Sequence, residues 1–219
     1  MAAHLPDRPA NTPYVFAVGK AAGPMAEEVE ALWGDDIRGM VVAPHGTVAS
    51  LKSLEWRSAA HPFPDAQGAA SASALLRAIT AVPPGADVLF LLSGGASSLL
   101  LATEEGPKPE ALQQATKALL NGGADIHQLN TVRRVLSPLL GGSVAAACAG
   151  NLQTLAISDV VGDDPIAIGS GPTVANPTGA AEASALLQRY GGGSPDILAW
   201  IDQQKTAGEI DSPYRIIAS

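Results

Sequence analysis

The 219-residue sequence is poor in cysteine and in aromatic residues: Cys148 is its one cysteine, and aromatics make up 4%. A single cysteine excludes an intrachain disulfide and a cysteine-based metal cluster, and it fits a reducing compartment. With so few aromatic side chains, the core must be built mainly from aliphatic residues. Because 47% of the residues are hydrophobic and 16% are charged, we expect a well-buried globular domain rather than disorder.

Basic residues are also scarce, with 13 Lys and Arg against 21 Asp and Glu, for a net charge of −8. An acidic surface disfavours nucleic acid and anionic membranes as partners, because phosphates are bound by clustered Lys and Arg. An anionic substrate would therefore require the few cations to be concentrated at its site.

Long apolar runs are missing as well. No segment has the roughly 18 uninterrupted apolar residues that a membrane-spanning helix needs. Residues 1–11 are polar and contain prolines, and they lack the apolar run of a signal peptide. We therefore expect a cytoplasmic protein with no membrane partner.

Short apolar runs that end in glycine or proline turns predict an α/β fold. Strands are predicted over 14–18, 39–43, 55–60, 88–92, 154–157 and 214–218, and helices over 25–33, 66–80, 109–121, 125–137, 141–149, 178–190 and 195–203. Asp65 is the predicted cap of the second helix. Since residues 88–92 are nearly all aliphatic, as in strands buried on both faces, the expected fold is a doubly wound, mostly parallel, Rossmann-like sheet with helices on both faces.

The predicted domain organisation is a short lead-in over 1–13 and one large domain over 14–212. The strand predicted near the C-terminus has nothing after it to cover the sheet. This favours a fragment, with 213–219 as the start of a further domain; an ordinary edge strand is the alternative.

Ligands of such sheets bind at the carboxyl ends of strands, and polar, glycine-rich loops follow Val18, Leu92 and Ile157. Lys20 stands between the first strand and a helix, where a cation and a helix N-terminus can meet an anion. The backbone amides of Ser93-Gly94-Gly95-Ala96-Ser97-Ser98 can form an anion nest. A solvated lysine and a plain tight turn are the alternatives.

Asn130-Thr131-Val132-Arg133-Arg134 lies on a predicted helix, so the adjacent arginines point in different directions and we expect one to face a site. Surface ion pairing is the alternative. The carboxylates Asp159, Asp163 and Asp164 follow a strand and suit Mg²⁺, a helix cap or a general base. His45 and His61 lack metal-ligand spacing, and local hydrogen bonding is the expected role of each.

Three well-known loop motifs are absent. The Walker A spacing does not occur around Lys20, and the Gly-x-Ser-x-Gly elbow of hydrolases lacks its last glycine at Leu99. The Gly-x-Gly-x-x-Gly dinucleotide fingerprint does not follow the first strand, which disfavours a nicotinamide-dependent enzyme.

Taken in order, six motifs resemble the N-terminal domain of the MOFRL-associated glycerate 2-kinases, some of which have been labelled hydroxypyruvate reductases. They are Val18-Gly19-Lys20-Ala21-Ala22, Ala60-His61-Pro62-Phe63-Pro64-Asp65, Leu92-Ser93-Gly94-Gly95, Asn130-Thr131-Val132-Arg133-Arg134, Ile157-Ser158-Asp159-Val160-Val161-Gly162-Asp163-Asp164 and Ser170-Gly171-Pro172-Thr173. The resemblance covers residues 14–219. It implies transfer of the ATP γ-phosphate to the 2-hydroxyl of D-glycerate, with Mg²⁺ or another divalent cation, in a site between two domains.

The site residues are assigned accordingly. Lys20 and Asp159 are assigned as catalytic, and Asp163 and Asp164 as metal ligands. The substrate- or nucleotide-binding residues are Ser93, Gly94, Gly95, Ala96, Ser97, Asn130, Arg133, Ser170, Gly171 and Thr173.

The chain departs from the family pattern at several positions, among them Arg134-Val135, where the resemblance implies Lys-His, and two positions near the expected ligands. Ala96 stands where the resemblance implies a third glycine, and Leu140 stands where it implies a basic residue near the anionic ligands. Two alternative functions remain: a degenerate domain that binds a small anion without catalysis, and an NAD(P)H-dependent hydroxypyruvate reductase. An apolar face left by a missing domain would promote self-association, so a homodimer is among the expected states.

Overall fold

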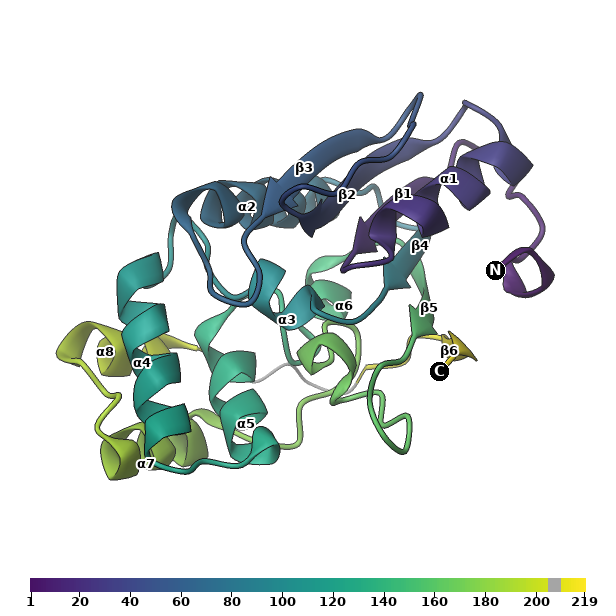
Figure 1. Cartoon of the computed structure of the whole chain (residues 1–219). Helices are drawn as coiled ribbons and strands as arrows, with labels where there is room; N and C mark the ends of the chain where they lie inside the picture. Colours follow the sequence, from purple (N-terminus) through teal and green to yellow (C-terminus); the bar gives the residue numbers. More distant parts are fainter. Residues whose placement is uncertain (205–209) are drawn as a thin grey trace.

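The computed structural model describes residues 1–204 and 210–219, and its centre is a six-stranded parallel sheet (Figure 1). The strands are β1 (Tyr14–Val18), β2 (Arg38–Pro44), β3 (Glu55–Ala59), β4 (Asp87–Leu92), β5 (Asn151–Ile157) and β6 (Tyr214–Ala218). Their order is β3-β2-β1-β4-β5-β6, the arrangement of Rossmann folds. The predicted fold class is therefore confirmed.

Helices cover both faces of this sheet. They are α1 (Ala22–Trp33), α2 (Ala66–Thr80), α3 (Ala96–Leu99), α4 (Pro109–Asn121), α5 (Ile126–Leu136), α6 (Ser143–Ala147), α7 (Ala180–Tyr190) and α8 (Pro195–Gln203), with 3₁₀ turns at Ala2–His4 and Ile168–Ser170. Helix α1 packs on one face, where Val29 and Trp33 meet Val15 and Ala17 of β1. The other helices contribute to the core of the opposite face, and α4, α5, α7 and α8 gather into one group beside the sheet (Figure 1).

The two cores follow from the alternation of side chains along the strands. Phe16 and Val18 of β1 belong to one core, whereas Val15 and Ala17 belong to the other. Both pairs are fully buried. Such strands read as continuous apolar runs, which is why the sequence signalled a parallel sheet.

The predicted strands and helices agree with the structure to within three residues at each end. The helix predicted over 141–149 is shorter and runs only over Ser143–Ala147, because Gly141 and Gly142 both have positive φ angles of 58° and 86°. The predicted cap of α2 is confirmed, since Asp65 accepts a hydrogen bond of 2.7 Å from the amide of Gly68. The short helix α3 was missed.

The lead-in and the last strand both join this domain. Met1 and Leu5 pack against the core on the α1 side, and Trp33 Nε1 donates to the carbonyl of Pro6 at 3.2 Å. β6 pairs in parallel with β5 as the sixth strand of the sheet. The assignment of 213–219 to the start of a further domain stays a prediction.

Candidate functional site at the carboxyl edge of the sheet

The register of the strands brings three predicted loops together. Val18 pairs with Leu92, and Leu92 pairs with Ala156. The residues after β1, β4 and β5 therefore emerge side by side at one edge. The chain leaves this edge in opposite directions from β1 and β4, so the edge is the topological switch point where α/β sheets bind ligands.

The loops after β1 and β4 are joined by direct hydrogen bonds. Lys20 donates its amide to the carbonyl of Gly94 at 2.9 Å, and Ser93 Oγ accepts from the amide of Ala21 at 3.0 Å. Ser93 is buried. Its hydroxyl thus holds the two loops in place, while the side chain of Lys20 is exposed at the edge.

Gly94 and Gly95 leave room for other side chains. A Cβ at Gly94 would collide with the carboxylate of Asp159, the residue that follows β5 by two positions. A Cβ at Gly95 would lie 3.0 Å from Nε2 of His61 and 3.2 Å from Cε of Lys20. The two glycines therefore let His61, Lys20 and Asp159 approach one loop backbone, which is the close approach that glycine permits.

A hollow of about 560 Å³ opens beside this loop. It is lined by His61, Pro62, Gly95, Ser97, Ser98, Ile126, His127, Asn130, Arg133, Asp159, Val160, Val161, Ala167 and Gly169. Its volume is in the range of small-molecule sites. Five of the predicted site residues line it: Gly95, Ser97, Asn130, Arg133 and Asp159.

The adjacent arginines of α5 take different roles. Arg133 lines the hollow, and Nε of each arginine is buried without a hydrogen-bond partner among the described residues. Burial lowers the pKa of Arg133, but a guanidinium stays charged in proteins. Arg134 turns away and donates to the hydroxyls of Thr131 at 3.2 Å and Thr178 at 3.5 Å. One arginine of the pair thus faces the hollow, and the other is held by hydroxyls inside the domain.

A hydroxyl chain supports the floor of the hollow. Ser97 Oγ and Ser170 Oγ lie 2.8 Å apart, and Ser170 Oγ donates to Oδ1 of Asn130 at 3.3 Å. Ser170 is completely buried and has a φ of 62°, a conformation that costs energy in a non-glycine residue. Ser170 therefore lies behind Ser97 and Asn130 and holds them in position.

Nine of the fourteen predicted site residues are not part of the hollow's lining, and Gly171, Thr173, Asp163 and Asp164 are four of them. The carbonyl of Gly171 accepts from the amide of Gly142 at 2.7 Å, and Thr173 Oγ1 accepts from Thr154 Oγ1 at 2.8 Å. Asp164 Oδ1 accepts from the amide of Ile166 at 3.1 Å. Asp163, beside it, has a positive φ of 53°. These contacts fix the loop after β5 internally.

Within residues 1–204 and 210–219, no group of three or more His, Cys, Asp and Glu side chains is placed to hold a metal ion. The charge of Asp164 instead acts on Arg134 and Tyr214: burial lowers the pKa of Arg134 and that carboxylate partly restores it. For Tyr214, burial and then Asp164 raise the pKa of the hydroxyl. The metal-binding roles of Asp163 and Asp164 stay predictions.

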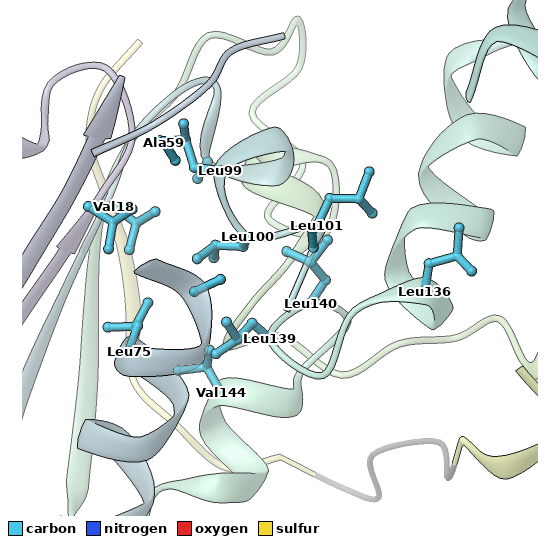
Figure 2. Close-up of a cluster of buried hydrophobic side chains, with 14 of the residues drawn as sticks. Val18, Ala59, Leu75, Leu99, Leu100, Leu101, Leu136, Leu139, Leu140 and Val144 are labelled. Atoms are coloured by element: carbon cyan, nitrogen blue, oxygen red, sulfur yellow. The ribbon is translucent and has the colours of Figure 1, made fainter. Parts of the chain in front are cut away.

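The two departures near the expected ligands, Leu140 and Ala96, are both buried in the apolar core. Leu140 is 0% exposed and packs in the core on the α2 side, among Leu100, Leu101 and Leu139 (Figure 2). Ala96 is also 0% exposed. Leu140 does not line the hollow, so the side chain at this position contributes to stability rather than to an anion site.

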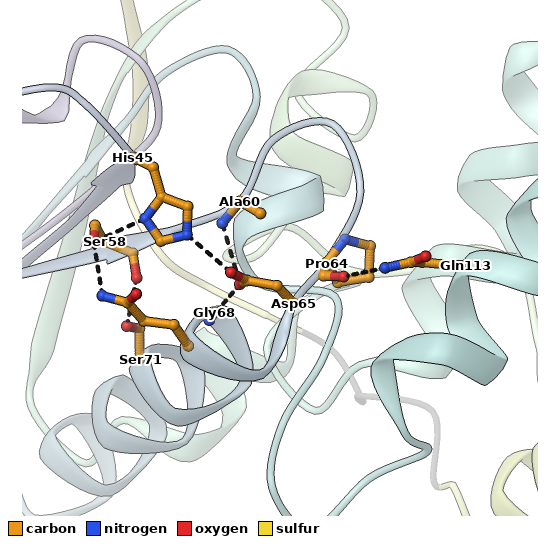
Figure 3. Close-up of polar contacts among 9 residues, drawn as sticks. His45, Ser58, Ala60, Pro64, Asp65, Gly68, Ser71 and Gln113 are labelled. Atoms are coloured by element: carbon orange, nitrogen blue, oxygen red, sulfur yellow. Dashed lines mark hydrogen bonds and ion pairs between the residues drawn. The ribbon is translucent and has the colours of Figure 1, made fainter.

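The two histidines that were expected to make local hydrogen bonds differ. His45 does so, with Nδ1 3.0 Å from Ser58 Oγ and Nε2 2.9 Å from Asp65 Oδ2 (Figure 3). His61 instead lines the hollow against Gly95. The sequence carried a signal for this, because His61 follows β3 at the same carboxyl edge as the three glycine-rich loops.

The fold and the site together define a Rossmann-type domain with a hollow, lined in part by Arg133, at its switch point. The chain matches the family described as "Domain of unknown function (DUF4147)" over residues 3–201, and it belongs to that family. The resemblance to the N-terminal domain of the MOFRL-associated glycerate kinases is confirmed by the relatives.

Similar proteins carry two different names. A "Putative hydroxypyruvate reductase" of Agrobacterium vitis is 39% identical over 99% of this chain and 51% of its own length. A "Glycerate 2-kinase" of Pyrococcus horikoshii is 40% identical over 81% of this chain and 40% of its own length. The crystal structure of a glycerate kinase from Thermotoga maritima superposes with a TM-score of 0.86 at 33% identity, covering 95% of this chain and 51% of that one.

The chain thus spans about half the length of the relatives that it matches. Among the helices that the structure describes, none is both long enough and apolar enough to cross a membrane.

Proposed function

We propose that this chain is the nucleotide-fold half of a glycerate 2-kinase, which transfers the γ-phosphate of ATP to the 2-hydroxyl of D-glycerate. The observation that carries the proposal is that two cations, Lys20 and Arg133, both lie near His61 and the glycine loop at the switch point of an acidic protein. Both substrates are anions, and phosphoryl transfer depends mainly on positioning and on positive charge around the transferred group.

Each residue type suits a part of this task. The Lys20 ammonium is an exposed point charge for a phosphate oxygen, and the planar Arg133 guanidinium suits a carboxylate or a phosphate. The backbone of Gly94 and Gly95 offers amides near the same place. Asp159 supplies the negative charge of the site beside Gly94.

A divalent cation fits this proposal only as a companion of ATP. The described residues do not form a protein cage for a metal ion. Mg²⁺ commonly takes one or two carboxylates and completes its shell with substrate phosphates and water. A phosphate-bound ion is therefore compatible with the site.

The name of the Agrobacterium relative supports a second candidate, reduction of hydroxypyruvate by NAD(P)H. The hollow would also accommodate that anion. Against this candidate, the turn after β1 lacks the dinucleotide fingerprint: Gly19 and Gly23 are separated by Lys20-Ala21-Ala22. The kinase is the better supported of the two.

A coupled assay of ATP-dependent phosphorylation of D-glycerate tests the proposal. The 219-residue chain is assayed alone and after addition of the separately expressed remaining half of the Thermotoga relative. We expect weak or no turnover alone and clear turnover in the mixture. NADH oxidation with hydroxypyruvate is measured in the same samples. Reductase activity, or the absence of both activities together with no ATP binding, would contradict the kinase.

A further inference from the structure

His61 is a site residue whose role remains to be explained. Its ring lines the hollow, and its Nε2 edge lies over the glycine loop, 3.0 Å from where a Gly95 Cβ would stand. Cε of Lys20 lies 3.2 Å from the same point. The imidazole and the ammonium stem therefore enclose one small volume above the loop that is proposed to hold phosphate.

The charged groups around His61 come from three elements. Lys20 follows β1, Arg133 comes from α5 and Asp159 follows β5, and His127 of α5 lines the same hollow. Partial burial, then Lys20, then Arg133 lower the pKa of His61, while Asp159 acts in the opposite direction. The net shift is below the ordinary 6.5, so the ring is neutral near pH 7 and can accept a proton.

We propose that His61 is the general base of the kinase, a role that rests on the function proposed above. As the glycerate 2-hydroxyl oxygen bonds to the γ-phosphorus, the proton of that hydroxyl moves to His61 Nε2. The bond between the γ-phosphorus and the β,γ-bridging oxygen breaks, and ADP leaves with its electron pair. The imidazolium then releases the proton to solvent, to which His61 is exposed.

This assignment explains why the site holds opposite charges side by side. Lys20 and Arg133 attract the anions and keep His61 unprotonated before the reaction. Asp159 offsets the positive charge that develops on His61 once it has taken the proton. Gly95 fits the same scheme, because a side chain there would push the ring and the lysine stem apart.

The test compares His61→Gln with His4→Gln, which changes a histidine of the lead-in. Both are assayed over pH 5–9 in the mixture with the complementary half. General bases contribute roughly 10²–10⁴-fold to rate, so we expect His61→Gln to lower kcat at least about 100-fold. KM for ATP and for glycerate should change less than about threefold, since binding is left intact. His4→Gln should match the wild type.

The pH profile provides the second readout. For the wild type, kcat should fall as the pH drops through the pKa of His61, below 6.5, and this acid limb should vanish in His61→Gln. An NMR titration of the His61 ring in the unmodified protein gives the same midpoint independently of any substitution. A His61 midpoint that differs from the acid limb overturns the assignment, as does a His61→Gln variant that keeps both kcat and the limb. An inactive wild type refutes the kinase itself, and His61 as its base with it.

Discussion

The loop after β4 and the loop after β5 both carry conspicuous motifs, but they use their residues differently. In the loop after β4, residues 93–98, two glycines matter because they leave space for His61, Lys20 and Asp159. In the loop after β5, residues 158–173, the polar side chains of Asp164, Ser170 and Thr173 are engaged with neighbours inside the domain. The residues of a motif can therefore shape the site in one loop and stabilise the fold in another.

The largest expected effect is at Lys20, the exposed cation that follows β1 and lies beside Gly95 of the loop after β4. Lys20→Ala should reduce phosphorylation by about 1,000-fold, comparable with the loss of one charge-stabilising donor in other enzymes. The melting temperature should stay unchanged, because the side chain is exposed and the amide bond to Gly94 is kept. Lys52→Ala, at an exposed ion pair with Asp35, is the matched control. Equal activity of the two variants would show that the edge formed by β1 and β4 takes no part in the reaction.

Gly94→Ala tests whether the glycine loop contributes to activity by leaving room for a neighbouring side chain. The new Cβ would displace the Asp159 carboxylate, and misplacing a catalytic group by about 1 Å can cost about 100-fold in rate. Because that carboxylate is exposed and can move, we expect stability to change little. Gly179→Ala introduces the same methyl group where nothing lies within 4 Å, and it should retain activity. A fully active Gly94→Ala would show that Asp159 is not needed where it lies.

The adjacent arginines of α5 allow a site residue and a structural residue to be compared within one helix. Arg133→Ala should weaken the binding of glycerate or ATP about tenfold, the loss of one charge-assisted contact, with little effect on unfolding. Arg134→Ala should leave affinity unchanged but lower the free energy of unfolding by about 2 kcal/mol, because it removes a buried and hydrogen-bonded side chain. Calorimetric titration and urea unfolding measure the two effects. The opposite pattern would reverse their assignment.

The smallest expected effect is at Asp65, outside the hollow. Burial alone would raise the pKa of this carboxyl, but hydrogen bonds from His45 and from the amides of Gly68 and Ala60 lower it overall. The stabilisation is therefore present above the ordinary pKa of 3.8 and is lost as the pH falls through the lower folded value. Asp65→Ala removes a helix cap and should cost about 1 kcal/mol at pH 7.

Urea unfolding of the two proteins at pH 7 and near pH 2.5 checks this expectation. The difference between them should shrink at the lower pH, because protonation of the wild-type carboxyl removes its hydrogen bonds as acceptor. A constant difference at both pH values would assign the effect to packing instead.

The sequence was sufficient for the fold because strands buried on both faces read as unbroken apolar runs, as Val88–Leu92 does. It also placed Lys20 and Gly95 at the correct edge, since glycine-rich loops after strands mark it. The sequence was less informative about the direction in which side chains point. The side chains of Ser93, Ser170 and Thr173 turn inward through hydrogen bonds to distant residues, and local spacing carries no information about such contacts. His61 was assigned only local hydrogen bonding, because the residues that surround it in the structure are distant in the sequence.

The central claim is that Lys20, beside Gly95, and Arg133, in the hollow, together form an anion site. The most direct test is calorimetric titration of ATP and D-glycerate into this 219-residue chain. The account predicts saturable binding at one site in the wild type, weakened by Lys20→Ala and by Arg133→Ala and unchanged by Lys52→Ala. Binding that is equally strong in all four proteins, or no binding of either ligand to the wild type, would contradict it.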